Sequence, residues 1–201
     1  QLKSIIPILN PDQMKNLIYP PFLPIITLVG ILPSALFLYI KNNFPEISEF
    51  SNICLDNIEV LYLGARIGNI CFNLLILCFI YKTCCLIFNS KKIATLSIIT
   101  LATDFTFNIT GHFVRHWNLS TLLIWITIFF AFKLYYSNKY KNYFYASISS
   151  GIGFGVSYVF GGFGFIYFVL FHFIKHKIKE LKKIIFSLII FLSLALISII
   201  I

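Results

Sequence analysis

The sequence predicts an all-α protein, a polytopic bundle of about six membrane-spanning helices with one juxtamembrane helix. Of its 201 residues, 59% are hydrophobic and only 11% are charged, and the mean hydropathy is +0.89. A water-soluble domain has about 25% charged residues, so lipid is the expected solvent. One helical crossing takes about 20 apolar residues, which leaves no room for a large soluble domain.

Basic residues gather in three short loops, which hold eleven of the sixteen lysines and arginines, while six of the seven acidic residues lie elsewhere. The positive-inside rule predicts that these loops share the cytoplasmic side. The net charge of +9 therefore sets the topology and does not indicate nucleic acid as a partner. The lysines concerned are Lys82, Lys91 and Lys92; Lys133, Lys139 and Lys141; and Lys175, Lys177, Lys179, Lys182 and Lys183.

Apolar runs between these loops predict spans of alternating direction. Residues 61–88 are expected to run inward, 93–109 outward and 119–136 inward again. The polar stretch 110–118 then forms an external loop. The last apolar run, 184–201, is predicted as a further span.

Residues 144–174 carry no formal charge and would measure about 46 Å as one helix. A crossing needs only about 30 Å, and basic loops at both ends place those ends on the same side. We therefore expect a hairpin of two short helices that turns at 160–163, with each leg too short to cross the hydrocarbon core alone. Irregular backbone at membrane depth is tolerated only inside protein or beside water, so this turn is expected to border a cavity.

Residues 1–60 are predicted to form an external segment with the juxtamembrane helix, and 61–201 to hold the spanning helices of the same single domain. Within the first segment, 21–40 is apolar but contains three prolines and lies in the most acidic part of the chain. Hydropathy alone favours a span there, whereas the topology favours a helix on the membrane surface. The sequence starts at Gln1 rather than Met, so we expect a further helix upstream.

The external loop connects Asp104 to a group of ionisable and aromatic side chains, His112, Arg115, His116 and Trp117. An ionisable residue at membrane depth usually faces a cavity or a partner, and Arg115 is the natural partner of Asp104. The alternative is a structural ion pair beside a tryptophan anchored at the interface. The histidine spacing would place both imidazoles on one helical face, but no glutamate lies between them and we assign no metal site.

His172 and His176 repeat this spacing beside the third lysine loop, where a phosphate-contacting or solvated loop is the simpler interpretation. Six of the ten glycines fall between Gly151 and Gly164. Close helix packing of the small-xxx-small kind explains Gly151 and Gly155 better than a phosphate-binding loop does.

Three short motifs and one glycine-rich stretch occur in order along residues 17–175. They are Tyr19-Pro20-Pro21-Phe22, Gly64-Ala65-Arg66-Ile67, His112-Phe113-Val114-Arg115-His116-Trp117 and the stretch that begins at Gly151. In this order and spacing, the chain resembles the GT-C membrane glycosyltransferases of family 39 type. That family includes the protein O-mannosyltransferases and the lipid A aminoarabinose transferases.

The resemblance implies a polyprenyl-phosphate sugar donor at the external face and inverting transfer to a lipid, glycan or protein acceptor. Fixed cations with bidentate contacts stabilise a phosphate leaving group, so the donor phosphate is expected to contact Arg115, Arg66 and His116. The residues expected to line the substrate cavity are Tyr19, Asp104, His112 and Trp117. The family's catalytic carboxylate is expected upstream of Gln1. No cofactor is firmly implied, and a divalent cation is left open.

The transferase has two rivals, a transporter or flippase with Asp104 and Arg115 lining its path, and a non-catalytic membrane subunit. An inverted-repeat transporter should show matching broken helices in both halves, and the sequence has only one such segment. The abundance of Ile, Lys, Asn and Phe is typical of an AT-rich genome. The expected location is therefore a bacterial cytoplasmic membrane, with membrane lipids as neighbours.

Overall fold

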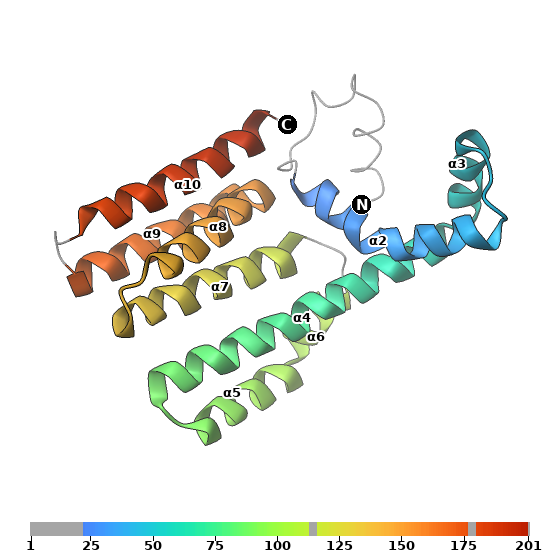
Figure 1. The fold of residues 1–201 in the computed structure, drawn as a ribbon. Helices are drawn as coiled ribbons and strands as arrows, with labels where there is room; N and C mark the ends of the chain where they lie inside the picture. Colours follow the sequence, from blue (N-terminus) through green and yellow to red (C-terminus); the bar gives the residue numbers. More distant parts are fainter. Residues whose placement is uncertain (1–21, 113–115, 177–179, 201) are drawn as a thin grey trace.

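The computed structural model describes residues 22–112, 116–176 and 180–200, and within these ranges it holds nine α-helices and no strand (Figure 1). This confirms the predicted all-α class. The helices are α2 (Phe22–Lys41), α3 (Ile47–Asp56), α4 (Ile58–Phe88), α5 (Lys91–Thr103), α6 (Phe105–His112), α7 (His116–Tyr136), α8 (Tyr140–Val156), α9 (Tyr158–His176) and α10 (Leu181–Ile200).

Four of these helices are long and apolar enough to cross a membrane, judged over the described residues. The spans are Ile58–Phe88 in α4, Trp117–Tyr136 in α7, Tyr158–His176 in α9 and Leu181–Ser198 in α10. They confirm a helical membrane bundle. In Figure 1, α7, α8, α9 and α10 form a compact group, and α8 contacts each of the other three. Helix α4 joins this group through its contact with α7.

The described parts of the three lysine loops lie together at one end of the bundle, called here the lysine-rich end. The Tyr136 hydroxyl donates to the Leu86 carbonyl at 3.0 Å and ties the end of α7 to the end of α4. Lys183 Nζ donates to the Asn138 carbonyl at 2.9 Å and joins the start of α10 to the connection between α7 and α8. The loops that the charge pattern grouped are therefore adjacent in space.

Residues 144–174 lie in two helices, α8 and α9, that fold back on each other. The break between them is at Ser157, earlier than the turn predicted at 160–163, because Gly161 belongs to the first turns of α9. A Cβ on Gly161 would overlap the backbone of Phe154, so this glycine permits the close approach of the two helices. As a result α9 keeps 19 residues and is long enough to cross, contrary to the expectation of two short legs.

The predicted span over 93–109 is not a single helix. Helix α5 ends at Thr103 and α6 begins at Phe105. With 13 residues, α5 is about 20 Å long, which is shorter than a hydrocarbon core of about 30 Å. The expectation of one continuous span was wrong because Asp104, which lies between the two helices, caps α6.

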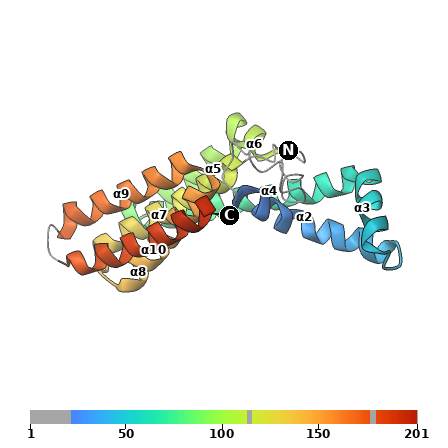
Figure 2. The same cartoon turned by 90° about the horizontal axis from the view of Figure 1, so that it is seen from above.

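Helix α2 lies along the first part of α4, and α3 sits at the far end of this pair (Figure 2). A Cβ on Gly64 would overlap the Ser34 side chain, and one on Gly68 would lie 3.4 Å from the Cα of Gly30. Both helices thus present small residues at a spacing of four, which allows close packing in lipid. Helix α2 continues through Pro33, and its location on the membrane surface stays a prediction.

Small polar and aromatic residues fill the contacts within the group α7 to α10. Thr127 Oγ1 and Ser149 Oγ lie 2.8 Å apart, and both side chains are buried. The Phe165 ring stacks on that of Phe191, with centroids 4.2 Å apart. Lipid gives no hydrophobic drive for helix association, so such packing and interhelical hydrogen bonds, worth about 0.6 kcal/mol each, hold the helices together.

Candidate functional site

Two of the predicted site residues lie at the end of the bundle opposite the lysine-rich end. Along α4, Arg66 is about 33 Å from Phe88, and along α7, Trp117 is about 28 Å from Tyr136. The hydrogen bond between Tyr136 and Leu86 places the ends of the two helices next to each other. Distances measured along α4 and α7 from these ends can therefore be compared. Arg66 and Trp117 therefore lie at similar depth, one hydrocarbon thickness from the lysines.

The Arg66 side chain is exposed, and its guanidinium carbon lies 4.5 Å from the centroid of the Tyr62 ring, one turn earlier on α4. In this cation–π contact one flat face of the guanidinium lies over the ring, and the N–H donors lie around the edge of the guanidinium. No hydrogen bond or ion pair links Arg66 to another residue within the described ranges. Its N–H groups are therefore oriented by Tyr62 and remain available for an anion.

Asp104 lies between α5 and α6 and caps the second of these helices. Its Oδ1 accepts a hydrogen bond from the backbone N–H of Phe107 at 2.7 Å. The amide of Asn108 donates to the carbonyls of Ala102 and Asp104 at 2.9 and 3.0 Å, which closes the end of α5. Aspartate is a preferred N-cap residue. The role that the structure gives to Asp104 is therefore to end one helix and start the next.

The two histidines of the external loop lie at the described ends of two helices. His112 is the last described residue of α6 and His116 is the first residue of α7. Their side chains, together with Arg115 and Tyr19, lie outside the described part of the structure, and the roles predicted for them stay predictions. Among the side chains that are described, no group of three or more His, Cys, Asp or Glu could hold a metal ion.

Two polar residues that the sequence interpretation missed lie on α4 below Arg66. Asn69 is buried, with 5% of its surface exposed. The Oδ1 atom of Asn73 is also buried and accepts no hydrogen bond in the structure as described. The sequence did carry a signal for them, because Arg66, Asn69 and Asn73 are spaced by three and four residues and share one helical face.

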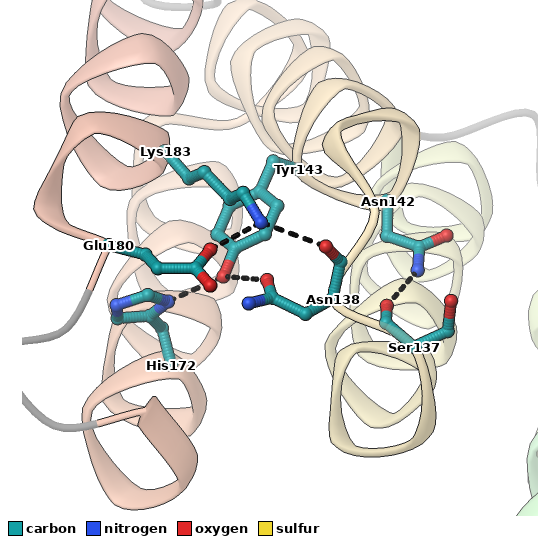
Figure 3. A network of polar contacts seen from close by, with 7 residues as sticks. All are labelled: Ser137, Asn138, Asn142, Tyr143, His172, Glu180 and Lys183. Carbon is teal, nitrogen blue, oxygen red and sulfur yellow. Dashed lines mark hydrogen bonds and ion pairs between the residues drawn. The ribbon is translucent and has the colours of Figure 1, made fainter.

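A second group of polar side chains, also missed, lies at the lysine-rich end (Figure 3). The solvated-loop interpretation of His172 was wrong: this residue is fully buried inside α9, and its Nδ1 lies 2.6 Å from the Tyr143 hydroxyl. Tyr143 donates its hydrogen to Asn138 Oδ1 at 3.0 Å, so His172 Nδ1 is the donor to the Tyr143 oxygen. These contacts join α8 to α9 and to the α7–α8 connection.

Glu180 and Lys183 form an ion pair at the start of α10. The hydrogen bond from Lys183 lowers the pKa of the exposed Glu180 carboxyl, and the Asn138 side chain adds to this effect. The backbone of Glu180 has a φ of 66°, a left-handed conformation that residues other than glycine seldom adopt. Through Asn138, which contacts both Lys183 and Tyr143, the ion pair and the network around Tyr143 hold the start of α10 against the α7–α8 connection.

One comparison with known proteins identifies a family. The sequence model of the dolichyl-phosphate-mannose-protein mannosyltransferases matches residues 50–201, well over half of the chain. The matched range includes all of α4 to α10, and hence Arg66, Asp104 and Trp117. No curated protein and no solved structure matches the chain.

Proposed function

Since the chain belongs to the dolichyl-phosphate-mannose-protein mannosyltransferase family, we propose that it transfers a sugar from a polyprenyl-phosphate donor to an acceptor at the external face of the membrane. Family membership makes it a membrane glycosyltransferase of the kind that uses polyprenyl-phosphate sugar donors in general. The external face, the residues that bind the donor and the bacterial cytoplasmic membrane as location belong to the proposal. The acceptor is a lipid, a glycan or a protein.

The position of Arg66 is the observation that carries this proposal. The positive-inside rule assigns the lysine-rich end to the cytoplasm, so a residue about 33 Å away on a straight helix lies at the external boundary of the bilayer. A lipid-linked phosphate sits at that boundary. Guanidinium groups bind phosphate oxygens through paired N–H donors, and the guanidinium of Arg66 is held by Tyr62 with those donors available.

In the proposed reaction, an acceptor oxygen attacks the anomeric carbon of the sugar. The bond from that carbon to the phosphate oxygen breaks, and the phosphate leaves with the electron pair. The acceptor proton passes to a base that we assign to no residue of this sequence. Negative charge builds up on the departing phosphate, and a fixed cation beside it stabilises the transition state. This is the role we give to Arg66.

The other residues named from the sequence complete the proposal. Arg115 and His116 would share the phosphate, and the imidazole could supply a proton or a hydrogen bond as it leaves. Tyr19, Asp104, His112 and Trp117 would line the sugar site. Asp104 would do so while it caps α6.

The test uses the full-length protein in proteoliposomes, with polyprenyl-phosphate-mannose as donor and its consumption as readout. Arg66→Gln should lower kcat/KM for the donor about tenfold or more, because a charge-assisted hydrogen bond of about 1.5–3 kcal/mol to the departing phosphate is lost. Arg66→Lys should recover part of this loss. The matched control is Lys82→Gln, which removes a cation that also lies over a ring, that of Phe79, near the lysine-rich end of the same helix.

Consumption of the donor by the wild type, together with a loss of kcat/KM in Arg66→Gln that Lys82→Gln does not show, supports the proposal. A wild type that moves the intact lipid between leaflets without breaking the sugar–phosphate bond would identify a flippase instead. Equal kcat/KM values for Arg66→Gln and Lys82→Gln would remove Arg66 from the site.

A further inference from the structure

The lysine-rich end carries far more positive than negative charge. Of the described acidic residues only Glu180 lies there, and its carboxylate is already in an ion pair with Lys183 (Figure 3). Six lysines with exposed side chains lie in, or directly beside, the first or last turn of a helix at this end. They are Lys91, Lys92, Lys139, Lys141, Lys175 and Lys182, called here the basic collar. Because like charges that lie close together repel one another, a negatively charged partner would stabilise this surface.

One lysine of the basic collar is held in a defined position. The Nζ of Lys175 lies 3.8 Å from the centroid of the Tyr135 ring, in a cation–π contact that joins the end of α9 to the end of α7. One turn earlier on each helix, the rings of Phe171 and Phe132 lie 4.6 Å apart and keep the two helices side by side. No described carboxylate pairs with Lys175. An ammonium group has three N–H donors, so contact with one ring leaves donors for an anion.

The aromatic side chains beside the basic collar indicate that it lies at the membrane interface. Tyr135, Tyr136 and Tyr140 are 50%, 60% and 54% exposed. Tyrosine is enriched where a bilayer meets water, because its ring is apolar and its hydroxyl is polar. Exposed tyrosines next to lysines therefore place the basic collar at the level of the lipid headgroups. A soluble acidic partner would use only the charges of this surface, whereas a lipid uses the charges and the rings.

We propose that the basic collar binds anionic phospholipids of the cytoplasmic leaflet, and that Lys175, held over Tyr135, contacts the phosphate of one of them. The positive-inside rule assigns this end to the cytoplasm, and anionic lipids give the cytoplasmic leaflet its negative surface potential. An ionised phosphate offers only acceptors and a lysine only donors, so the two groups are complementary. The inference goes beyond the proposed function and does not depend on it, because Arg66 lies at the opposite end of the bundle.

The test measures the Kd of the full-length protein in neutral detergent for two probes, phosphatidylglycerol and phosphatidylcholine. Both lipids carry a phosphate, but the choline cation makes the second one neutral overall. The wild type should bind phosphatidylglycerol about tenfold more tightly or better, and added salt should reduce this preference. Lys175→Gln should lower the preference about fivefold, which is the contribution of one lysine near an anionic membrane surface.

The matched control is Lys41→Gln, because Lys41 is also an exposed lysine in the last turn of its helix but lies beside α3, away from the lysine-rich end. This variant should keep the wild-type preference. Lys175→Arg should keep it too, since arginine retains both the charge and the contact with the ring. Tyr135→Leu should lower the preference about twofold to threefold, whereas Tyr135→Phe should not, because phenylalanine still offers a ring to the lysine.

Three results would overturn the inference. The first is a wild type with equal Kd values for the two lipids. The second is a preference that Lys175→Gln retains in full. The third is displacement of phosphatidylglycerol by an equal concentration of sn-glycerol 3-phosphate, or by polyglutamate of equal charge, which would identify a surface for soluble anions or for an acidic protein. Donor consumption tests the proposed function separately and is unaffected by any of these results.

Discussion

The Tyr143 hydroxyl and Nδ1 of His172 lie 2.6 Å apart, on two fully buried side chains that are 29 residues apart in the sequence. This contact closes the α8–α9 pair at the lysine-rich end. The Gly161–Phe154 contact closes the same pair near its turn. The two helices are thus fixed to each other at both ends by contacts of different kinds.

Tyr143→Phe should lower the free energy of unfolding by about 1–3 kcal/mol, because it removes the hydroxyl that contacts the buried His172 and the partly buried Asn138. Unfolding in mixed detergent micelles would measure the change. The matched control is Tyr140→Phe on the same helix, where the tyrosine is exposed and its hydroxyl makes no hydrogen bond to the described residues. Equal stability of the two variants would show that the buried contact contributes nothing.

Gly161→Ala should destabilise the protein by about 1–3 kcal/mol or more, because the new methyl group would overlap the backbone of Phe154. Gly162→Ala is the neighbouring control, since no atom lies within 4 Å of a Cβ built there. That control should be neutral or slightly stabilising, as alanine favours a helix over glycine. Thermal melting of the two variants measured side by side would test whether the destabilisation is specific to Gly161. A stable Gly161→Ala protein would mean that the helices can separate at their turn without loss.

Asp104→Ala should cost about 1 kcal/mol of stability through loss of the cap on α6. Asp104→Asn and Asp104→Ser should retain most of it, because each keeps a side-chain acceptor for the Phe107 N–H. Donor consumption should be measured for the same variants. It distinguishes the capping role of Asp104 from a role that needs its negative charge. Loss of activity in Asp104→Asn, with stability unchanged, would favour a pairing of the carboxylate with Arg115 or its placement in a transport path.

The pairing of Glu180 with Lys183 predicts a dependence of stability on pH. The pKa of this carboxyl is lower in the folded protein than its ordinary value of 4.5. The ion pair therefore stabilises the fold fully above that ordinary value, and its contribution is lost as the pH falls through the folded pKa. Melting temperatures of wild type and Glu180→Gln should differ at pH 7 and converge at acidic pH. A constant difference across the range would contradict this assignment.

Hydropathy and charge predicted most of the architecture, because both follow directly from the lipid solvent. The expected spans 61–88, 119–136 and 184–201 correspond closely to α4, α7 and α10. The position of the α8–α9 break was predicted wrongly because glycine was taken as a turn signal. In lipid, Gly161 serves close helix packing inside α9 instead.

The polar contacts were less accessible from the sequence. Pairing Tyr143 with His172 requires knowledge of which faces of α8 and α9 meet, and the spacing of His172 and His176 does not give that knowledge. Asn69 and Asn73 could have been found from the sequence, because they follow Arg66 at spacings of three and four residues and therefore share its helical face. The predicted roles of Tyr19 and Arg115 fall on residues outside the described structure.

Helix α4 runs unbroken from Ile58 to Phe88 and carries α2 and α7 on separate faces. Gly64 and Gly68 face α2, while Ile76 and Ile80 face α7, and the two directions differ by about 120° at 100° per residue. One extra residue between these contacts would swing α2 about 100° around the axis of α4. Seven extra residues would restore its direction to within about 20° but carry it about 10 Å further from the bundle. The angular place of α2 therefore depends on the number of residues in this interval rather than on their identity.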